Sequence, residues 1–404
     1  MHILQVNSDY EYGSTGRIAS ELQDRIVLGG DKCTVAYGRK RIKDVKNSYV
    51  IQIGSTFDNY LHLVQTRIFD VHGFSSLWAT KAFIKKIDFL KPDLIHLHNL
   101  HGYYIHIGSL FEYLKKIKKP VIWTLHDCWP FTGHCAYYDY IGCDKWKKVC
   151  HHCALKGEYP SSYYIDRSSE NYQQKKKIFN GMYNLTFVTP SRWLMRQVED
   201  SYLNEYPVKV INNGIDIDVF KPVLSDIKRS YNLEGKFLIL GVASVWGERK
   251  GLQYFIDLAE RLKPDERIIL VGVSERQIKQ LPDGIIGVRS TNSTSQLAEI
   301  YSSADVFVNP TLEDNYPTTN LEAMACGTPV ITFNSGGSAE SIKEGCGIVV
   351  ERGDLEKLVQ AISVIKKNRK NFYDANCRQH ALLSFNKNER FEEYIELYRY
   401  CVDG

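Results

Sequence analysis

Short apolar runs alternate with helical patterns along nearly the whole chain, a pattern typical of parallel sheets connected by crossover helices. A first series predicts five strands, at residues 2–6, 33–37, 94–97, 121–125 and 185–188. Amphipathic patterns at residues 15–28 and 111–117 predict helices between them. The first half of the chain is therefore predicted to form one open parallel sheet.

A second series of apolar runs begins near residue 237. It predicts strands at residues 237–243, 268–271, 306–309, 330–333 and 347–350, with helices at residues 251–262, 293–302 and 319–325. Turn residues at 212–222 separate the two series. A last amphipathic helix is predicted at residues 388–402, with apolar Phe391, Ile395, Tyr398 and Val402.

These patterns predict an α/β protein with two Rossmann-like domains. In open parallel sheets, ligands bind beyond the carboxyl ends of the strands, so we expect a site in a cleft between the domains. The length of 404 residues exceeds what one hydrophobic core supports, which agrees with two domains. The segment 128–169 is aromatic, rich in Cys and His and without periodicity, and we interpret it as an insertion at a strand end.

Composition limits the class of protein. The hydrophobic fraction of 44% and the charged fraction of 24% are those of ordinary globular chains. The start of the chain does not resemble a secretory signal, and no run approaches the roughly 20 apolar residues of a spanning helix. We therefore expect a cytoplasmic protein.

Charge is distributed unevenly along the chain. Residues 1–212 carry a net charge of about +8 and the remainder about −4, which together give the overall +4. The basic tracts are either solvated helix faces or a surface for peripheral contact with the cytoplasmic face of the inner membrane. They are short and lack a nucleic-acid motif, so we expect no nucleic-acid partner.

The strongest chemical signal lies at residues 311–330, between a predicted strand and a helix that ends at Gly327. A helix start at a strand end presents free backbone N–H groups and a positive dipole end, which suits a diphosphate. Asp314 and Glu322 are carboxylates, which accept hydrogen bonds from sugar hydroxyls. On spacing alone, Asp314 as a helix cap and Glu322 as an exposed helical acid are equally good interpretations.

A second signal is the basic pair Arg249-Lys250, which follows a predicted strand and precedes a helix. Such a lysine can neutralise charge on a departing phosphate, or the pair can be simply solvated. In the first half, Gly13 and Gly16 lie between the first strand and helix, where glycine lets a ligand approach the backbone. The loop lacks the G-x-G-x-x-G fingerprint, which disfavours a nicotinamide cofactor.

The segment from Asp314 to Val330 resembles the donor-site motif of retaining glycosyltransferases of family 4, the glycosyl transferases of group 1. That motif is E-x7-E followed by A-M-A-C-G-x-P-V, and residues 323–330 match its ending at every defined position. Asp314 stands where the family usually has Glu. The resemblance implies that Asp314 contacts the donor sugar, Glu322 the ribose, and the amides of Asn315 and Tyr316 the diphosphate.

The resemblance extends along most of the chain and implies further roles. Lys250 matches the lysine of the family's strand–loop element, whose arginine falls on Ser244, so Arg249 is the candidate replacement. The loop of Gly13 and Gly16 would close over the diphosphate and acceptor. His126, at the end of strand 121–125, would contact the transferred sugar through a ring N–H or the backbone. The candidate catalytic residues are thus His126, Asp314 and Lys250.

The fold implied by the resemblance is GT-B, with two Rossmann-like domains and a C-terminal helix that crosses back. The expected domains are residues 1–212 for the acceptor, with the insertion 128–169; residues 213–387 for the nucleotide sugar; and residues 388–404 as the crossover helix. A bacterial surface-polysaccharide type is suggested by H-D-x-W-x-F-T-G-H-C at residues 126–135.

Four cysteines in the insertion form a separate candidate site. Cys135, Cys143, Cys150 and Cys153 could hold a structural zinc, with His134, His151 and His152 as other candidate ligands. Free thiols and disulfides are the alternatives. No catalytic metal or other catalytic cofactor is expected, because the family uses none and no D-x-D follows a strand.

Together these features predict a retaining transferase of hexosyl-type sugars. Its donor would be a nucleotide-diphosphate sugar and its acceptor a glycan or lipid-linked oligosaccharide of capsule, exopolysaccharide or O-antigen. The acceptor class rests on association, because a fold and a donor site do not specify an acceptor. Two alternatives stay open: a nucleotide-sugar epimerase of the same fold, and a non-catalytic nucleotide-sugar-binding protein.

Overall fold

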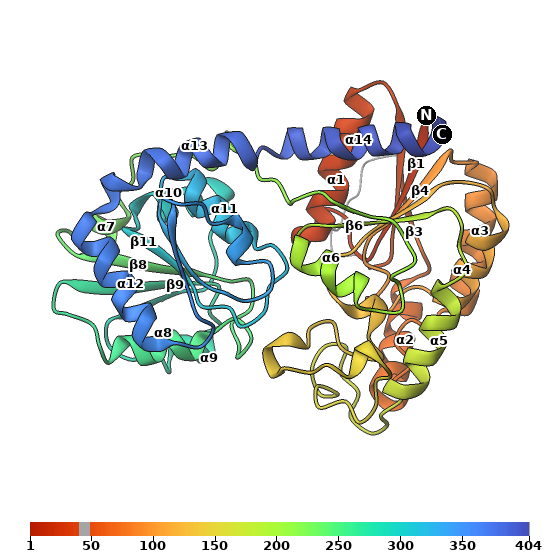
Figure 1. Ribbon diagram of the computed structural model, residues 1–404, viewed down its shortest axis with the longest axis horizontal. Helices are drawn as coiled ribbons and strands as arrows, with labels where there is room; N and C mark the ends of the chain where they lie inside the picture. Colours follow the sequence, from red (N-terminus) through yellow and green to blue (C-terminus); the bar gives the residue numbers. More distant parts are fainter. Residues whose placement is uncertain (40–48, 404) are drawn as a thin grey trace. The chain divides into compact units, whose positions relative to one another are not determined.

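The computed structural model describes residues 1–39 and 49–403 (Figure 1). The chain divides into two compact units. Unit 1 comprises Met1–Ile211 with Phe391–Gly404, and unit 2 comprises Asn212–Arg390. No helix among the described residues has the length and apolar character needed to cross a membrane.

Unit 1 is built on a parallel sheet of seven strands in the order β3-β2-β1-β4-β5-β6-β7. Its strands are β1 (His2–Asn7), β2 (Lys32–Tyr37), β3 (Val50–Gln52), β4 (Leu94–Leu97), β5 (Val121–Thr124), β6 (Leu185–Thr189) and β7 (Val208–Val210). Its helices are α1 (Gly13–Leu28), α2 (Thr56–Phe69), α3 (Leu77–Leu90), α4 (Ile107–Lys116), α5 (Ser168–Phe179) and α6 (Arg192–Glu199).

Unit 2 repeats this plan with six parallel strands in the order β10-β9-β8-β11-β12-β13. The strands are β8 (Phe237–Val242), β9 (Glu266–Val271), β10 (Ile285–Val288), β11 (Val306–Asn309), β12 (Val330–Phe333) and β13 (Gly347–Val350). The helices are α7 (Ile227–Ser230), α8 (Leu252–Ala259), α9 (Glu275–Ile278), α10 (Thr294–Ser303), α11 (Thr318–Ala325), α12 (Leu355–Asn368) and α13 (Asp374–Ser384). Both sheets reverse their strand order next to their first strand, which is the doubly wound arrangement.

The last helix, α14 (Lys387–Asp403, blue in Figure 1), starts in unit 2 and packs on unit 1. Phe391 and Ile395 are buried with Ile3 and Leu22 in one cluster under β1 and α1. This packing agrees with the expected crossover helix. Val402, predicted on the apolar face, is 37% exposed, so that face ends one turn before the helix does.

Short chain segments next to the unit boundary pair with each other. The N–H of Ile215 donates to the Phe385 carbonyl at 2.8 Å, and the N–H of Lys387 donates to the Ile215 carbonyl at 3.0 Å. A side chain at Gly214 would approach the Lys387 Cα within 2.4 Å, so only glycine allows this pairing. The predicted turn segment that begins at residue 212 is therefore held to the residues that precede α14.

Candidate functional site

Two loops meet at the carboxyl ends of the neighbouring strands β8 and β11 in unit 2. The N–H of Leu312 donates to the Arg249 carbonyl at 2.8 Å, which ties the loop after β11 to the loop after β8. Gly251, at φ +75°, makes this possible, because a Cβ there would lie 2.1 Å from the Pro310 oxygen. The basic pair and the acidic segment of the sequence analysis are thus brought together.

Lys250 and Asp314 form an ion pair across these two loops. Their side chains are 22% and 15% exposed, so both charges are largely removed from water. Burial lowers the pKa of Lys250, while Asp314 opposes that effect. Burial raises the pKa of Asp314, but Lys250, Arg249 and the hydrogen bonds outweigh it and leave that pKa below its usual range. Each group therefore favours the charged form of the other.

The backbone under Asp314 is also fixed by the loop after β12. Gly337 donates its N–H to the Asp314 carbonyl at 2.9 Å, and a Cβ on Gly336, at φ +55°, would lie 2.0 Å from that same oxygen. The sequence analysis did not select this Gly-Gly pair, although two adjacent glycines after a strand were the available signal. Arg249 is held nearby, since its Nη1 donates to the Glu313 carbonyl at 2.7 Å.

Asn315 and Tyr316 lie between Asp314 and the start of α11. The N–H of Asn315 donates to Asp314 Oδ1 at 3.0 Å, and the Tyr316 carbonyl accepts from Asn213 Nδ2 at 3.0 Å. The residue before α11 is Pro317, which caps the helix with no side-chain hydrogen bond. No capping side chain accordingly takes up the N–H groups of the first turn of α11.

Glu322 lies on α11 and is buried, not exposed on the helix surface. Its Oε2 accepts a hydrogen bond at 2.9 Å from the hydroxyl of Tyr301, a residue of α10. Burial, followed by the Glu322 charge, raises the pKa of Tyr301, so this phenol stays a donor. Tyr301 was missed in the sequence, because nothing in the spacing of α10 connects it with the motif.

In unit 1, the glycine loop lies at the end of β1 and α1 begins within it, at Gly13. Gly13 has φ +68°, and a Cβ on Gly16 would lie 3.3 Å from the Asp9 backbone. Thr15 Oγ1 accepts from Asn99 Nδ2 at 3.5 Å, which joins this loop to the segment after β4. Both glycines are therefore set at the carboxyl edge of the sheet.

His126 follows β5 and is connected to a chain of hydrogen bonds. His98 Nε2 lies 3.0 Å from Gln5 Oε1, which can only accept, so His98 carries its proton on Nε2. Burial keeps the pKa of His98 well below its usual value, so His98 is neutral and its Nδ1 accepts from His126 Nε2 at 3.2 Å. Burial also lowers the pKa of His126 to about 4. Neutral His126 consequently presents a bare Nδ1, an acceptor.

A second polar chain, which the sequence analysis did not assign, lies beside His126. His101 Nε2 is 2.7 Å from Asp127 Oδ2 and its Nδ1 is 2.8 Å from the hydroxyl of Tyr159. The other oxygen of Asp127 accepts from the Trp129 N–H at 3.0 Å. Burial raises the pKa of Asp127, but His101 and these hydrogen bonds outweigh it and leave that pKa below its usual range. Both oxygens of the Asp127 carboxylate thus accept hydrogen bonds from groups of unit 1.

The four cysteines of the insertion lie together, separate from the sites above. Cys135, Cys143, Cys150 and Cys153 line one pocket with His134. None of the ten cysteines, all within the described residues, forms a disulfide. In the described part of the chain, no group of three or more His, Cys, Asp or Glu side chains is arranged to hold a metal ion.

Comparison with known structures identifies the fold. A sucrose-phosphate synthase from Thermosynechococcus elongatus superposes with a TM-score of 0.73, covering 99% of this chain and 98% of that one at 18% identity. Anabaena HepE in complex with UDP superposes with a TM-score of 0.65, covering 98% and 99% at 17% identity. With two doubly wound sheets, the fold is that of the GT-B glycosyltransferases.

Sequence comparison identifies the family. The model of Glycosyltransferase Family 4 matches residues 56–219, and that of Glycosyl transferases group 1 matches residues 236–368. A protein of Escherichia coli (strain K12) named as a colanic acid biosynthesis glycosyl transferase, WcaC, is 26% identical over 99% of this chain and all of its own length. The chain belongs to glycosyltransferase family 4 and is a transferase enzyme.

One further relative has a more specific name. A Campylobacter jejuni N,N'-diacetylbacillosaminyl-diphospho-undecaprenol alpha-1,3-N-acetylgalactosaminyltransferase is 25% identical over 63% of this chain and 72% of its own. The expected fold class, enzyme class and family are confirmed by these matches. The roles of individual residues, the zinc and the domain functions stay predictions.

Proposed function

We propose that this enzyme is a retaining transferase that moves a hexosyl-type sugar from a nucleotide-diphosphate donor onto a glycan or lipid-linked oligosaccharide. The observation that carries the proposal is the ion pair of Lys250 and Asp314, placed at two strand ends beside the start of α11. A diphosphate needs positive charge and N–H donors, and a sugar needs acceptors for its hydroxyls. Lys250 and the N–H groups at the start of α11 can bind the diphosphate, and the Asp314 carboxylate can accept from the sugar hydroxyls.

Donor binding exchanges the partners of this ion pair. The diphosphate takes Lys250 and the N–H groups at the start of α11, and the sugar hydroxyls take the carboxylate of Asp314. Glu322, which Tyr301 holds in place, accepts from the ribose. When the sugar leaves, charge builds up on the diphosphate beside Lys250, and a cation fixed in advance stabilises that state without reorganisation.

Retention of configuration is best served by front-side displacement guided by the leaving phosphate. Asp127 is a poor nucleophile for a double displacement, because both of its oxygens are engaged by His101 and the Trp129 N–H. His126 positions the transferred sugar by accepting a hydroxyl hydrogen bond on its bare Nδ1, or through its backbone.

The acceptor class is supported by the relatives. The name of one refers to colanic acid biosynthesis, and that of another to a diphospho-undecaprenol acceptor. A glycan precursor linked to a lipid is consistent with both names. The net positive charge of residues 1–212 would attract the diphosphate that links glycan and lipid. We therefore place this enzyme in surface-polysaccharide assembly, at the cytoplasmic face of the membrane.

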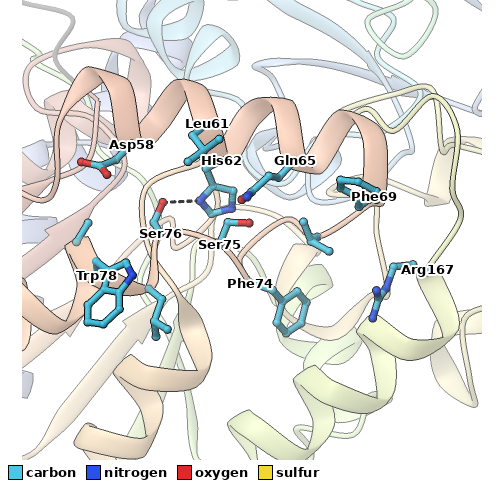
Figure 2. A pocket seen from close by; sticks show the side chains of 13 residues that line it. Asp58, Leu61, His62, Gln65, Phe69, Phe74, Ser75, Ser76, Trp78 and Arg167 are labelled. Carbon is cyan, nitrogen blue, oxygen red and sulfur yellow. Dashed lines mark hydrogen bonds between the residues drawn. The ribbon is translucent and has the colours of Figure 1, made fainter.

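Helices α2 and α3 are the surface of unit 1 best suited to an anionic membrane. Figure 2 shows Leu61, Phe69 and Trp78 around a pocket of about 500 Å³ between them. Trp78 is 78% exposed, and Lys81 Nζ lies 5.1 Å from its ring centre. Exposed aromatic rings with adjacent lysines are the composition of interfacial helices, where rings enter the headgroup layer and lysines meet anionic lipid.

The proposed reaction is tested by binding and turnover with UDP-, GDP-, ADP- and dTDP-sugars. Sugars of one nucleotide class should raise the melting temperature. A ligand at a hundredfold excess over its Kd stabilises the folded state by about 2.7 kcal/mol. Glu322→Ala should lose this shift, while Glu340→Ala, on the 3₁₀ turn after β12, should keep it. Turnover with a lipid-linked glycan extract should then release nucleoside diphosphate only when acceptor is present.

Two outcomes would contradict the proposal. Release of nucleotide or an epimerised donor without any acceptor would identify an epimerase instead. A shift without turnover under any acceptor mixture would identify a binding protein that has lost activity.

A further inference from the structure

The insertion of unit 1 contains little regular structure. Between β5 and α5, the structure describes only three 3₁₀ turns: Trp129–Phe131, Asp139–Ile141 and Lys145–Lys147. This segment nonetheless buries large side chains, among them Trp129, Phe131 and Trp146. A segment without a helix or a strand ladder needs another source of order, and small irregular modules commonly obtain it from a metal.

Four thiols from different turns of this segment converge on one place. Cys135, Cys143, Cys150 and Cys153 all line a pocket of about 250 Å³. Cys135 lies close enough to Cys153 for a hydrogen bond and is within electrostatic reach of Cys150 and Cys143. Four sulfurs in one pocket are the donor set of a closed, tetrahedral structural zinc site.

A backbone N–H group beside these thiols donates a hydrogen bond to one of the sulfurs. The N–H of Gly133 donates to Cys150 Sγ at 3.2 Å, so this sulfur serves as a hydrogen-bond acceptor. A Cβ at Gly133 would lie 1.9 Å from the Ser168 carbonyl oxygen, so glycine is required for this approach. The turn that carries Gly133 also carries Cys135 and so fixes two of the sulfurs relative to each other.

An independent observation is the orientation of His134, which lines the same pocket. Its Nδ1 lies 2.6 Å from Asp70 Oδ1, and the two side chains are 0% and 1% exposed. Its Nε2 is buried and has no hydrogen-bond partner among the described residues. A buried ring nitrogen without a partner, beside four sulfurs, indicates that this pocket holds a group absent from the structure.

We propose that this pocket binds one Zn²⁺ through the thiolates of Cys135, Cys143, Cys150 and Cys153. The four thiols release four protons to solvent as the Zn–S bonds form, and no electron is transferred. Zn–S bonds of about 2.3 Å require the sulfurs to turn toward a common centre, because they are not arranged around an ion in this structure. His134 lies beside the sulfurs and offers its Nε2 for a hydrogen bond to a thiolate.

The surroundings balance the charge of such a centre. Zn²⁺ with four thiolates carries a net charge of −2, which is costly to bury alone. Lys175 is fully buried beneath the insertion, with Nζ 2.9 Å from the Trp129 carbonyl and within electrostatic reach of Cys150 and Cys135. Burial lowers the pKa of Lys175 to about 7 in the metal-free pocket, and a centre of charge −2 favours its ammonium form, which then supplies counter-charge from α5.

Metal analysis of the full-length protein tests this site. After purification with Zn²⁺ present and removal of loose metal, we expect about one zinc per chain, falling below about 0.2 in Cys143→Ser and Cys150→Ser. Cys128→Ser is the matched control: Cys128 is a buried cysteine of the same segment that does not line the pocket, and its variant should keep the zinc. A strong chelator should lower the melting temperature, and Zn²⁺ but not Mg²⁺ should restore it.

Several results would overturn the proposal. One is a zinc content near zero in the wild-type protein together with a melting temperature unaffected by Zn²⁺ or chelator. Another is an intact mass about 2 or 4 Da below that of the reduced chain, which would reveal disulfides. Loss of zinc in His134→Ala but not in Cys143→Ser would refute the four-cysteine ligand set. Metal content and melting are independent of turnover, so this test stands apart from that of the proposed reaction.

Discussion

Lys250 and Asp314 neutralise each other in a place where both are largely withdrawn from water. A buried charge without a partner is costly, so each residue depends on the other before a donor arrives. In the proposed complex, the diphosphate would replace Asp314 as the anionic partner of Lys250, and sugar hydroxyls would donate hydrogen bonds to the Asp314 carboxylate. Under the proposed function, Lys250 is placed for the diphosphate of the donor and Asp314 for its sugar.

Replacing Asp314 with Asn should test this match. The amide keeps the size of the side chain and removes its charge, so turnover should fall by about 100-fold or more, as when one preorganised catalytic contact is lost. Glu248→Gln, in the exposed part of the same loop as Lys250, should keep turnover within a factor of about two. Steady-state kinetics of both variants measure the effect. Equal turnover of Asp314→Asn and the wild type would remove Asp314 from the site.

The sequence pointed to the residues that belong to a contiguous motif. Asp314 and Glu322 come between a strand and the end of a helix, so their place at the carboxyl end of the sheet could be predicted, while their contact with a ligand stays a prediction. Tyr301 could not be, because its contact with Glu322 depends on how α10 packs on α11. The same holds for the chain from Gln5 through His98 to His126, since Gln5 lies on β1 and the two histidines follow β4 and β5. That chain also fixes which nitrogen His126 presents, which no pattern reveals.

At the scale of elements, α14 is fastened to unit 1 by a buried polar contact. The hydroxyl of Tyr398 lies 2.7 Å from Nδ1 of His96 on β4. The hydroxyl oxygen of Thr124 on β5 lies 2.8 Å from Nε2 of the same histidine. His96 is thus a structural residue that joins two strands to the helix. Burial lowers the pKa of His96 to about 3, so the contact is between neutral groups.

Tyr398→Phe should destabilise this attachment. The substitution keeps the ring but leaves His96 Nδ1 buried without its donor, at a cost of about 1–3 kcal/mol. Tyr400→Phe is the matched control, since Tyr400 is 79% exposed on the same helix and should change stability by less than about 0.5 kcal/mol. Urea unfolding at pH 7 compares the two. Equal stabilities would mean that His96 finds another partner.

Helices α2 and α3 carry the prediction on membrane contact. Replacing Trp78 and Phe57 together with Ser removes two rings that are 78% and 72% exposed, so folding should be unaffected. Flotation with vesicles rich in anionic lipid should fall severalfold. Phe372→Ser, an aromatic residue 63% exposed in unit 2, should float like the wild type. No difference among the three proteins would exclude this surface.

Elements with strong periodicity were predictable, and short or irregular ones were not. The strands with continuous apolar runs were predicted within a few residues. β3 and β7 were not, because a run of three residues carries too little pattern, and in β10 Gly287 interrupts the apolar run. In the insertion, side chains contact distant parts of unit 1, as His134 contacts Asp70 at the end of α2, and such contacts leave no periodic pattern in the sequence. Its Cys and His content was the only available signal.

At the scale of the whole molecule, histidines are gathered in unit 1. Of the twelve in the chain, His380 alone belongs to unit 2. Burial lowers the pKa of His62 and His96 to about 3 and that of His126 to about 4, and holds those of His72 and His98 well below their usual values. These rings are buried as neutral groups in unit 1, while unfolding returns them to a pKa near 6.5.

This asymmetry predicts that mild acid weakens unit 1 first. Between about pH 6.5 and 4, these histidines are protonated in the unfolded state but stay neutral in the folded state. Their contribution to the free energy of unfolding is therefore fully present above about pH 6.5 and is lost as the pH falls. Hydrogen exchange at pH 7 and pH 5, corrected for intrinsic rates, should show a larger loss of protection in the strands of unit 1 than in those of unit 2. His126→Gln should reduce the loss in unit 1. Asp and Glu residues occur in both units. An equal loss of protection in the two units would therefore assign the acid sensitivity to these carboxylates and not to the buried histidines.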